Sequence, residues 1–184
     1  GRVFIDQRPK KILKRLEFGH FEGDFIESGK DGKGSLLVLV ERKTRYPFIA
    51  YLEDRSNAKV NQLVEESLKD IPIKSLTIDN DISFQKHEEL SEILNSAIYF
   101  CHPQSPHEKG TIENRNKAIR RYVKKRSDLS SFPREYFKMV ETKLRDRFMK
   151  CLNYKTPREA FEEEILKIKK PLVCGMIREI LLAN

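Results

Sequence analysis

The stretch His20–Leu52, HFEGDFIESGKDGKGSLLVLVERKTRYPFIAYL, decides the fold of this chain. Over residues 20–26 polar and apolar side chains largely alternate, which is typical of a strand with one face on a core. A Lys-Asp-Gly-Lys-Gly turn at 30–34 leads into the continuous apolar run Ser35–Val40, as expected of a strand buried on both faces. A charged turn and a third strand over 46–52 follow. Three consecutive strands with short turns predict an antiparallel meander.

Beyond the meander, helical and strand patterns alternate. Ser56 is a good N-cap for a helix that ends before Pro72. Strands are predicted over 74–79 and 97–101. The other predicted helices cover residues 84–94, 111–125, 132–151, 157–166 (with Thr156 as N-cap) and 172–183. This order predicts an α/β fold, with a mixed five-stranded sheet flanked by helices on both faces.

Composition and net charge indicate which classes of partner the protein binds. The 184 residues carry a net charge of +8, with 39% hydrophobic and 35% charged residues, which fits one domain with a polyanionic partner. No apolar run approaches the roughly 18 residues of a membrane span, so we expect no membrane partner. Cys101, Cys151 and Cys174 are odd in number and far apart, which favours a reducing cytoplasm over a disulfide framework. The start has no signal-peptide pattern, and it is Gly rather than Met, so we expect a piece of a longer protein.

Three acidic positions are the candidate catalytic residues: Asp24, Asp79 and Glu113. Each lies in or beside an apolar run, where a carboxylate is costly to bury unless it is paired or holds a metal. Asp24 is predicted mid-strand, Asp79 at a strand end and Glu113 in the first turn of a helix. If the three converge, they form an oxygen cage for two Mg²⁺ or Mn²⁺ ions acting on a phosphodiester.

Each of these carboxylates also has an ordinary structural interpretation. An aspartate at a strand end is usually a turn or cap residue, and a glutamate at a helix start usually compensates the helix dipole. The joint pattern, in a basic chain, is what favours a DNA-processing site over three unrelated structural roles.

Several motifs in the same order resemble the transposases of the insertion sequence thirty family, which are bacterial DDE transposases with a retroviral-integrase-like core. The matching stretches are Gly19–Asp24, Leu39–Tyr46, Thr77–Asn80, Tyr99–Cys101, Ser105–Pro106, Gly110–Asn114 and Leu152–Glu159. The resemblance covers about His20 to Phe161. It implies an RNase H-like fold and a DDE triad of Asp24, Asp79 and Glu113 that holds two Mg²⁺ or Mn²⁺ ions.

The resemblance also implies a domain plan and a setting. We expect a basic arm or linker over 1–17, an RNase H-like integrase/transposase catalytic core over 18–166 and a helical tail over 167–184. The implied function is DNA strand cleavage and strand transfer by a homo-oligomer assembled on transposon ends and target DNA, in the bacterial cytoplasm at the nucleoid. Two alternatives stay open: a transposase-derived DNA-binding or regulatory protein, and a nuclease that does not join strands.

Some positions depart from the family pattern. Asp81 stands at a position usually taken by glycine, Ser83 at an acidic position, and Phe21 where tryptophan is usual. The usual Ser-Pro-Trp-Gln is Ser-Pro-His-Glu at 105–108. The triad itself is intact.

A basic strip follows Glu113 along the predicted helix. The candidate DNA-binding residues are Arg115, Lys117, Arg120, Arg121, Lys124 and Lys125. Helical spacing puts Lys117, Arg120, Arg121 and Lys124 on the face of Glu113. The alternative is a solvated charged face, but we favour contact with DNA phosphates because the strip begins at a candidate catalytic residue.

Other polar residues near these motifs are candidates for supporting roles. They are His20, Glu22, Asn80, His102, Lys109 and Asn114. For His20 a packed core histidine is an equally good interpretation, and for the two asparagines a helix or turn cap is.

Overall fold

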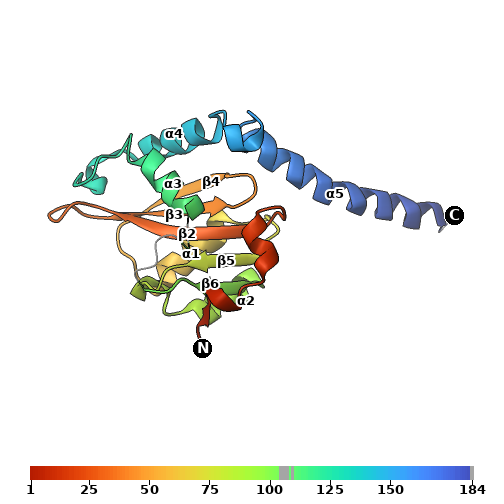
Figure 1. Ribbon diagram of the computed structural model, residues 1–184, viewed down its shortest axis with the longest axis horizontal. Helices are drawn as coiled ribbons and strands as arrows, with labels where there is room; N and C mark the ends of the chain where they lie inside the picture. Colours follow the sequence, from red (N-terminus) through yellow and green to blue (C-terminus); the bar gives the residue numbers. More distant parts are fainter. Residues whose placement is uncertain (104–107, 109, 183–184) are drawn as a thin grey trace.

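The computed structural model describes residues 1–103, 108 and 110–182. Its centre is a mixed sheet in the order β1-β6-β5-β2-β3-β4 (Figure 1). The strands are β1 (Val3–Phe4), β2 (His20–Glu27), β3 (Ser35–Glu41), β4 (Pro47–Leu52), β5 (Ser75–Ile78) and β6 (Ala97–Phe100). The pairs β2–β3 and β3–β4 are antiparallel, which confirms the predicted meander. Strand β5 runs parallel to both β2 and β6.

The prediction of five strands was one short. Val3 and Phe4 form β1, which pairs in parallel with Tyr99 and Phe100 of β6. Two residues are too few to show an alternating pattern, so only the pairing reveals this strand.

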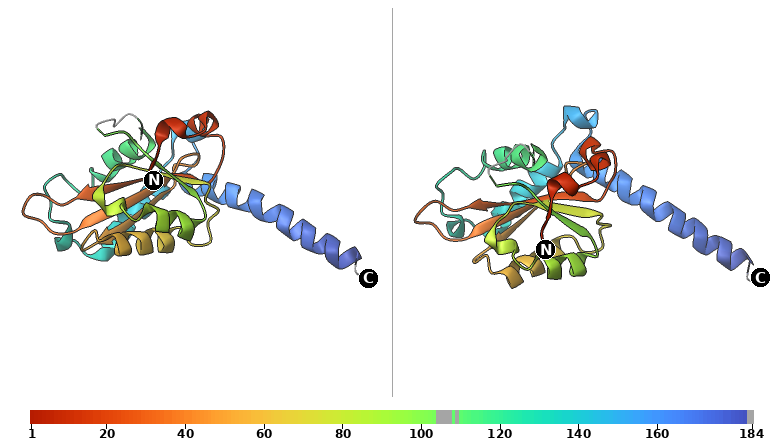
Figure 2. Two further views of the ribbon diagram at one scale, coloured as in Figure 1. Left: turned by 90° about the horizontal axis from the view of Figure 1, so that it is seen from below. Right: turned by 60° about the horizontal axis from the view of Figure 1, so that its bottom comes forward.

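Helices cover both faces of the sheet (Figure 2). One face carries α1 (Asn57–Ser67) and α2 (His87–Leu94), and the other carries α3 (Gly110–Ile119) and α4 (Arg134–Arg145). Short 3₁₀ helices are described over Ile5–Gln7, Lys10–Lys14, Ile82–Phe84, Leu129–Ser131 and Lys150–Leu152.

The sheet separates two apolar clusters, one on each face. Its strand β3 is buried along its whole length because it contributes side chains to both clusters. Leu37 and Leu39 pack toward α1 and α2, whereas Leu36 and Val38 pack toward α3 and α4. The continuous apolar run therefore serves both faces, as expected of a central strand.

Three predicted helices have different bounds. The helix predicted from Phe84 starts only at His87, after a 3₁₀ turn. The helix predicted through Lys125 ends at Ile119, and Val123 fills the core from the turn that follows. The helix predicted through Cys151 ends at Arg145. Apolar spacing continued past that point to Phe148, but this side chain is 69% exposed.

A single helix, α5 (Pro157–Leu182), replaces the two predicted around Pro171. A proline removes one backbone donor from a helix, at a cost, without having to end it. The predicted start is confirmed, because Thr156 Oγ1 accepts from Glu159 N (3.1 Å) and Glu159 Oε2 accepts from Thr156 N (2.7 Å). This is a capping box. The predicted end at Ala183 lies outside the described residues.

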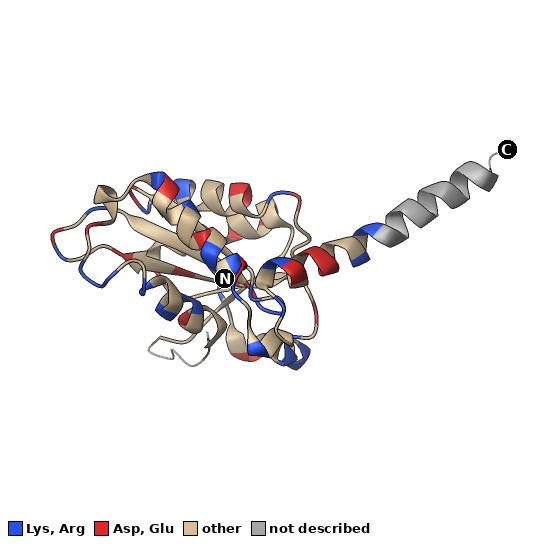
Figure 3. Ribbon diagram, turned by 90° about the horizontal axis from the view of Figure 1, so that it is seen from above, with Lys and Arg blue, Asp and Glu red and all other residues tan. Residues whose placement is uncertain are grey.

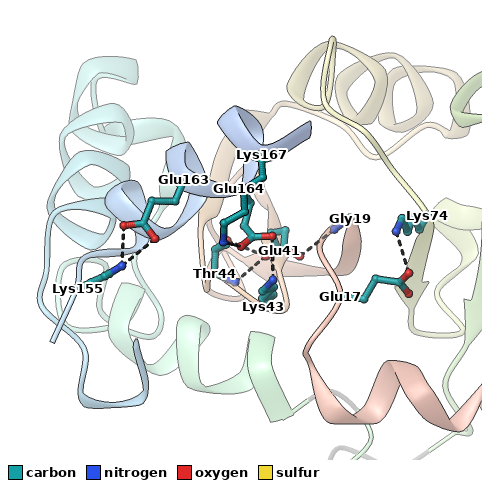
Figure 4. A network of polar contacts seen from close by, with 10 residues as sticks. All are labelled: Glu17, Gly19, Glu41, Lys43, Thr44, Lys74, Lys155, Glu163, Glu164 and Lys167. Carbon is teal, nitrogen blue, oxygen red and sulfur yellow. Dashed lines mark hydrogen bonds and ion pairs between the residues drawn. The ribbon is translucent and has the colours of Figure 1, made fainter. Parts of the chain in front are cut away.

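The first turns of α5 are attached to the sheet, and the rest extends away from it (Figure 1). Phe161 stacks on Tyr46. Glu164 pairs with Lys43 from the β3–β4 turn at 2.8 Å, as Figure 4 shows. Beyond the acidic first part, Lys and Arg bands follow on α5 (Figure 3). Within the described part of the chain, no helix is both long and apolar enough to cross a membrane.

Candidate active site

The register of β2 and β5 places Asp24 and Asp79 level with each other. The two strands are parallel, with His20 opposite Ser75 and Glu22 opposite Thr77. Continuing this register by two residues brings Asp24 level with Asp79, directly after the end of β5. Alternation along a strand puts Asp24 on the face of Glu22 and His20, and His20 Nδ1 bonds Ser75 Oγ at 2.7 Å across that face. The pairing therefore brings two of the candidate carboxylates to one place on the sheet.

Helix α3 lies over this pair and carries the third carboxylate. Ile112 N donates to Glu22 Oε2 (2.8 Å), and Asn116 Nδ2 donates to Asp24 Oδ2 (2.9 Å). Glu113 precedes Asn116 by three residues, so both lie on the same side of the helix. The half-buried Glu113 is thus on the side of α3 that faces β2.

The donor chemistry of the three carboxylates fits Mg²⁺ or Mn²⁺, which prefer hard oxygen ligands. Among the residues described, however, no three His, Cys, Asp or Glu side chains form a group that could hold a metal ion. Asp24 and Asp79 are level on the sheet and Glu113 is on the helix that faces them. The three carboxylates are therefore carried by neighbouring elements, but their side chains are not grouped as a set of metal ligands.

Glu22 has a structural role beside the site. It is fully buried and pairs with Arg42 Nε at 2.8 Å. Arg42 also donates to the carbonyl oxygen of Ile12 (2.5 Å). Because Glu22 accepts from the first turn of α3 as well, this ion pair joins β2, the β3–β4 turn, the N-terminal segment and α3.

The two candidate histidines are engaged in other contacts. His20 is buried, and its Nε2 bonds Glu17 at 2.8 Å. Burial lowers the pKa of His20, although Glu17 opposes that effect. Asp24 lies four positions further along the strand, about 13 Å away. His102 bonds Glu108 and Asp6, each at 2.9 Å, and the hydrogen bond that His102 donates to Glu108 raises the pKa of His102.

The remaining supporting candidates are scattered. Asn80 accepts a hydrogen bond from Arg2, and Asn114 is exposed on α3. Lys109 lies outside the described residues.

Sequence comparison relates the chain to known transposases. No protein-family model matches it. It is 34% identical over 164 residues to the transposase InsI of insertion sequence element IS30A from Escherichia coli K12, covering 88% of this chain and 42% of that protein. It is 36% identical over 167 residues to the transposase of IS4351 from Bacteroides fragilis, covering 90% and 51%. The chain is a homologue of the IS30-family transposases. It spans about half the length of these curated relatives.

Two solved structures show the same fold. The catalytic core domain of BIV integrase superposes with a TM-score of 0.66 at 15% identity, covering 82% of this chain and 98% of that one. A chain of the simian T-cell lymphotropic virus intasome superposes with a TM-score of 0.65 at 15% identity, covering 77% and 53%. The RNase H-like fold of this transposase homologue is thereby confirmed.

Two departures from the family pattern in this transposase homologue, Asp81 and Ser83, form a local cap. Asp81 accepts from Ser83 N (2.7 Å) and pairs with Arg55 (3.1 Å). Burial raises the pKa of Asp81, but these hydrogen bonds and the Arg55 charge outweigh burial and lower it. The additional negative charge of Asp81 is thus balanced by Arg55. Asp81 is also the N-cap of the 3₁₀ turn that begins at Ile82.

Only some side chains of the predicted basic strip are exposed to solvent. Lys117 on α3 is exposed, as are Arg121, Lys124 and Lys125 in the segment after it. Because α3 ends at Ile119, the prediction that Lys124 shares a helical face with Glu113 was wrong.

Two arginines of the strip point to protein groups. Arg115 is buried and donates to the carbonyl oxygen of Arg45 (2.6 Å), and burial together with the Arg45 charge lowers its pKa to about 10. Arg120 is half-buried and donates to the carbonyl oxygen of Glu27 (3.3 Å).

Three residues of this region were not among the predicted site residues: Asn116, Arg42 and Arg8. Asn116 contacts Asp24, and its spacing of three from Glu113 was a usable signal. Arg8 is buried and donates to Thr77 Oγ1 (3.0 Å), two residues before Asp79. Nothing in the basic N-terminal sequence distinguishes Arg8 from its neighbours.

Proposed function

We propose that this chain is the catalytic part of a transposase that cleaves DNA and transfers strands, with Asp24, Asp79 and Glu113 as its DDE triad. The observation that supports the proposal is the β2–β5 register: continued by two residues, it sets Asp24 level with Asp79, and Asn116 of α3 donates to Asp24. The similarity to transposases supports the reaction class.

In this proposal the three carboxylates hold two Mg²⁺ or Mn²⁺ ions. Such ions, when bound, activate a water or DNA 3′-hydroxyl and stabilise the leaving oxygen. The protein's own part is positioning: Asn116 fixes the orientation of the Asp24 carboxylate, and Glu22 fixes the first turn of α3 over β2. Phosphoryl transfer depends mainly on such positioning and on charge neutralisation.

A strand-cleavage and strand-transfer assay with Mn²⁺ tests the proposal, on supercoiled plasmid and on oligonucleotides. We expect Asp79→Asn to lower cleavage at least about a hundredfold, since residues that merely orient metal ligands already cost about 10–100-fold. Asp70→Asn is the matched control, because Asp70 is an exposed aspartate after α1. Joined products support a transposase, whereas cleavage without joining supports the nuclease alternative. Retained cleavage in Asp79→Asn rules out the triad.

The exposed part of the basic strip is proposed to contact DNA phosphates. The double change Lys117→Ala with Lys124→Ala should weaken binding equally for all sequences and lower the slope of log K against log salt by up to about 2. Fluorescence anisotropy with a duplex oligonucleotide measures it. The control is Lys69→Ala with Lys86→Ala, near the α1–α2 face. Equal slopes for the two double variants contradict this surface.

We also propose that the protein works as a homo-oligomer on transposon ends and target DNA, in the bacterial cytoplasm at the nucleoid. The likeness to a chain of a viral intasome and the bacterial relatives support this setting.

A further inference from the structure

A hollow of about 600 Å³ lies on the flank of α3, away from the side that faces Asp24. Thr111, Arg115 and Ala118 line it at helical spacing, whereas Glu113 and Asn116 lie on the other side of the helix. Outside α3 and Arg121, which follows it, the lining comes from Arg15, from Arg45 in the β3–β4 turn, and from residues 147–151 between α4 and α5. Four separate segments of the chain therefore build one concavity.

The lining of this hollow is strongly cationic. No Asp or Glu is among the described residues that line it. The arginines are Arg15, Arg45, Arg115, Arg121 and Arg147. Within the described part of the chain, none of them forms an ion pair with a carboxylate. Like charges gathered without counter-charges cost free energy, and a protein retains such a cluster most readily where an anion offsets it.

Two buried polar atoms in the lining have no hydrogen-bond partner among the described residues: Thr111 Oγ1 and Arg15 Nε. Thr111 is only 6% exposed and Arg115 only 5%. A buried donor left without an acceptor is costly, so both atoms are explained by a ligand that supplies acceptors. Burial, with the neighbouring Arg45 and Arg42 charges, lowers the pKa of Arg15, which reflects the same excess of positive charge.

We propose that this hollow binds a backbone phosphate of DNA. This contact is additional to the one that DNA makes with the carboxylates of the proposed active site. Phosphate oxygens match the forked donors of arginine and accept from a hydroxyl, which suits this lining. DNA is the favoured source because Lys117 and Arg121, which line the hollow, are exposed members of the proposed DNA-contacting strip. The assignment of the phosphate to DNA rests on the proposed function, whereas the affinity of the hollow for phosphate does not.

The first test uses inorganic phosphate and thermal unfolding of the whole chain at constant ionic strength. We expect phosphate, relative to chloride, to raise the Tm of the wild type more than that of Thr111→Val, which keeps the shape and removes the hydroxyl. Phosphate also stabilises proteins by exclusion from their surface, so the difference between the two proteins is the informative quantity. An equal rise in both overturns the site.

The second test identifies the source of the phosphate. Arg147→Gln with Lys150→Gln removes two exposed cations of the hollow that are not in the basic strip. The salt slope for duplex binding should fall by about 0.9, one phosphate's share, while Lys69→Gln with Lys86→Gln leaves it unchanged. An unchanged slope, with the phosphate response intact, overturns the assignment to DNA in favour of a free phosphate. Failure of the proposed catalysis is recognised separately, because neither test measures cleavage.

Discussion

At the scale of single residues, Glu22 is fully buried and its charge is balanced by Arg42. We expect Arg42→Met to lower the free energy of unfolding by about 3–5 kcal/mol, because it leaves a carboxylate buried without its cation. Urea unfolding measures the loss. The double variant Glu22→Gln with Arg42→Met should recover much of it, since no charge then stays buried and the lost bond to Ile12 is common to both variants. A loss below about 1 kcal/mol contradicts this role.

A second residue-scale prediction concerns pH. Burial lowers the folded-state pKa of His20, so the unfolded chain takes up a proton more readily than the native protein. The stability contributed by neutral His20 is present above its unfolded pKa and is lost as the pH falls from about 7 toward 5. We expect His20→Gln to flatten the fall in Tm between pH 7.5 and 5.5. His102→Gln should steepen it, because the hydrogen bond that His102 donates to Glu108 raises the pKa of His102. Parallel Tm profiles for both variants would refute this account.

At the scale of elements, the contact between α3 and β2 determines where Glu113 lies. Asn116 makes that contact at Asp24, so it is a positioning residue in the proposed site. We expect Asn116→Ala to raise the Mg²⁺ concentration for half-maximal cleavage roughly tenfold or more, with DNA affinity in EDTA unchanged. Gln62→Ala is the control, since it removes a similar amide-to-carboxylate bond (2.9 Å, to Glu66) on α1. Unchanged Mg²⁺ dependence would exclude a positioning role.

At the scale of the whole molecule, residues 1–17 pack against the core. Arg8 and Ile12 are buried, and β1 extends the sheet next to β6. We expect a chain that starts at Phe18 to unfold at a clearly lower urea concentration, because it loses these contacts and the acceptor of Arg42. A matched chain that ends at residue 169 should change less, as α5 extends away from the sheet. Equal midpoints for the full chain and the chain from Phe18 would support an independent arm.

Local sequence patterns were enough for the central strands and for the start of α5. Alternation over 20–26, the apolar run at 35–40 and the Thr156 cap each reflect a preference of a few neighbouring residues. Helix ends were less predictable. Apolar spacing records which face is buried but not where the backbone turns, so Val123 reaches the core from outside α3 and Phe148 stays exposed.

By itself, the sequence determined the identity of the three candidate carboxylates, the class of fold and the basic character of the chain. Only the tertiary structure decided that Asp79 is level with Asp24, that Arg115 is buried, and that cations from four segments line one hollow. The physical reason is that motifs and periodicity are local, whereas register and burial arise when distant segments pair. A charged residue shows its partner, or its lack of one, only after the chain has folded.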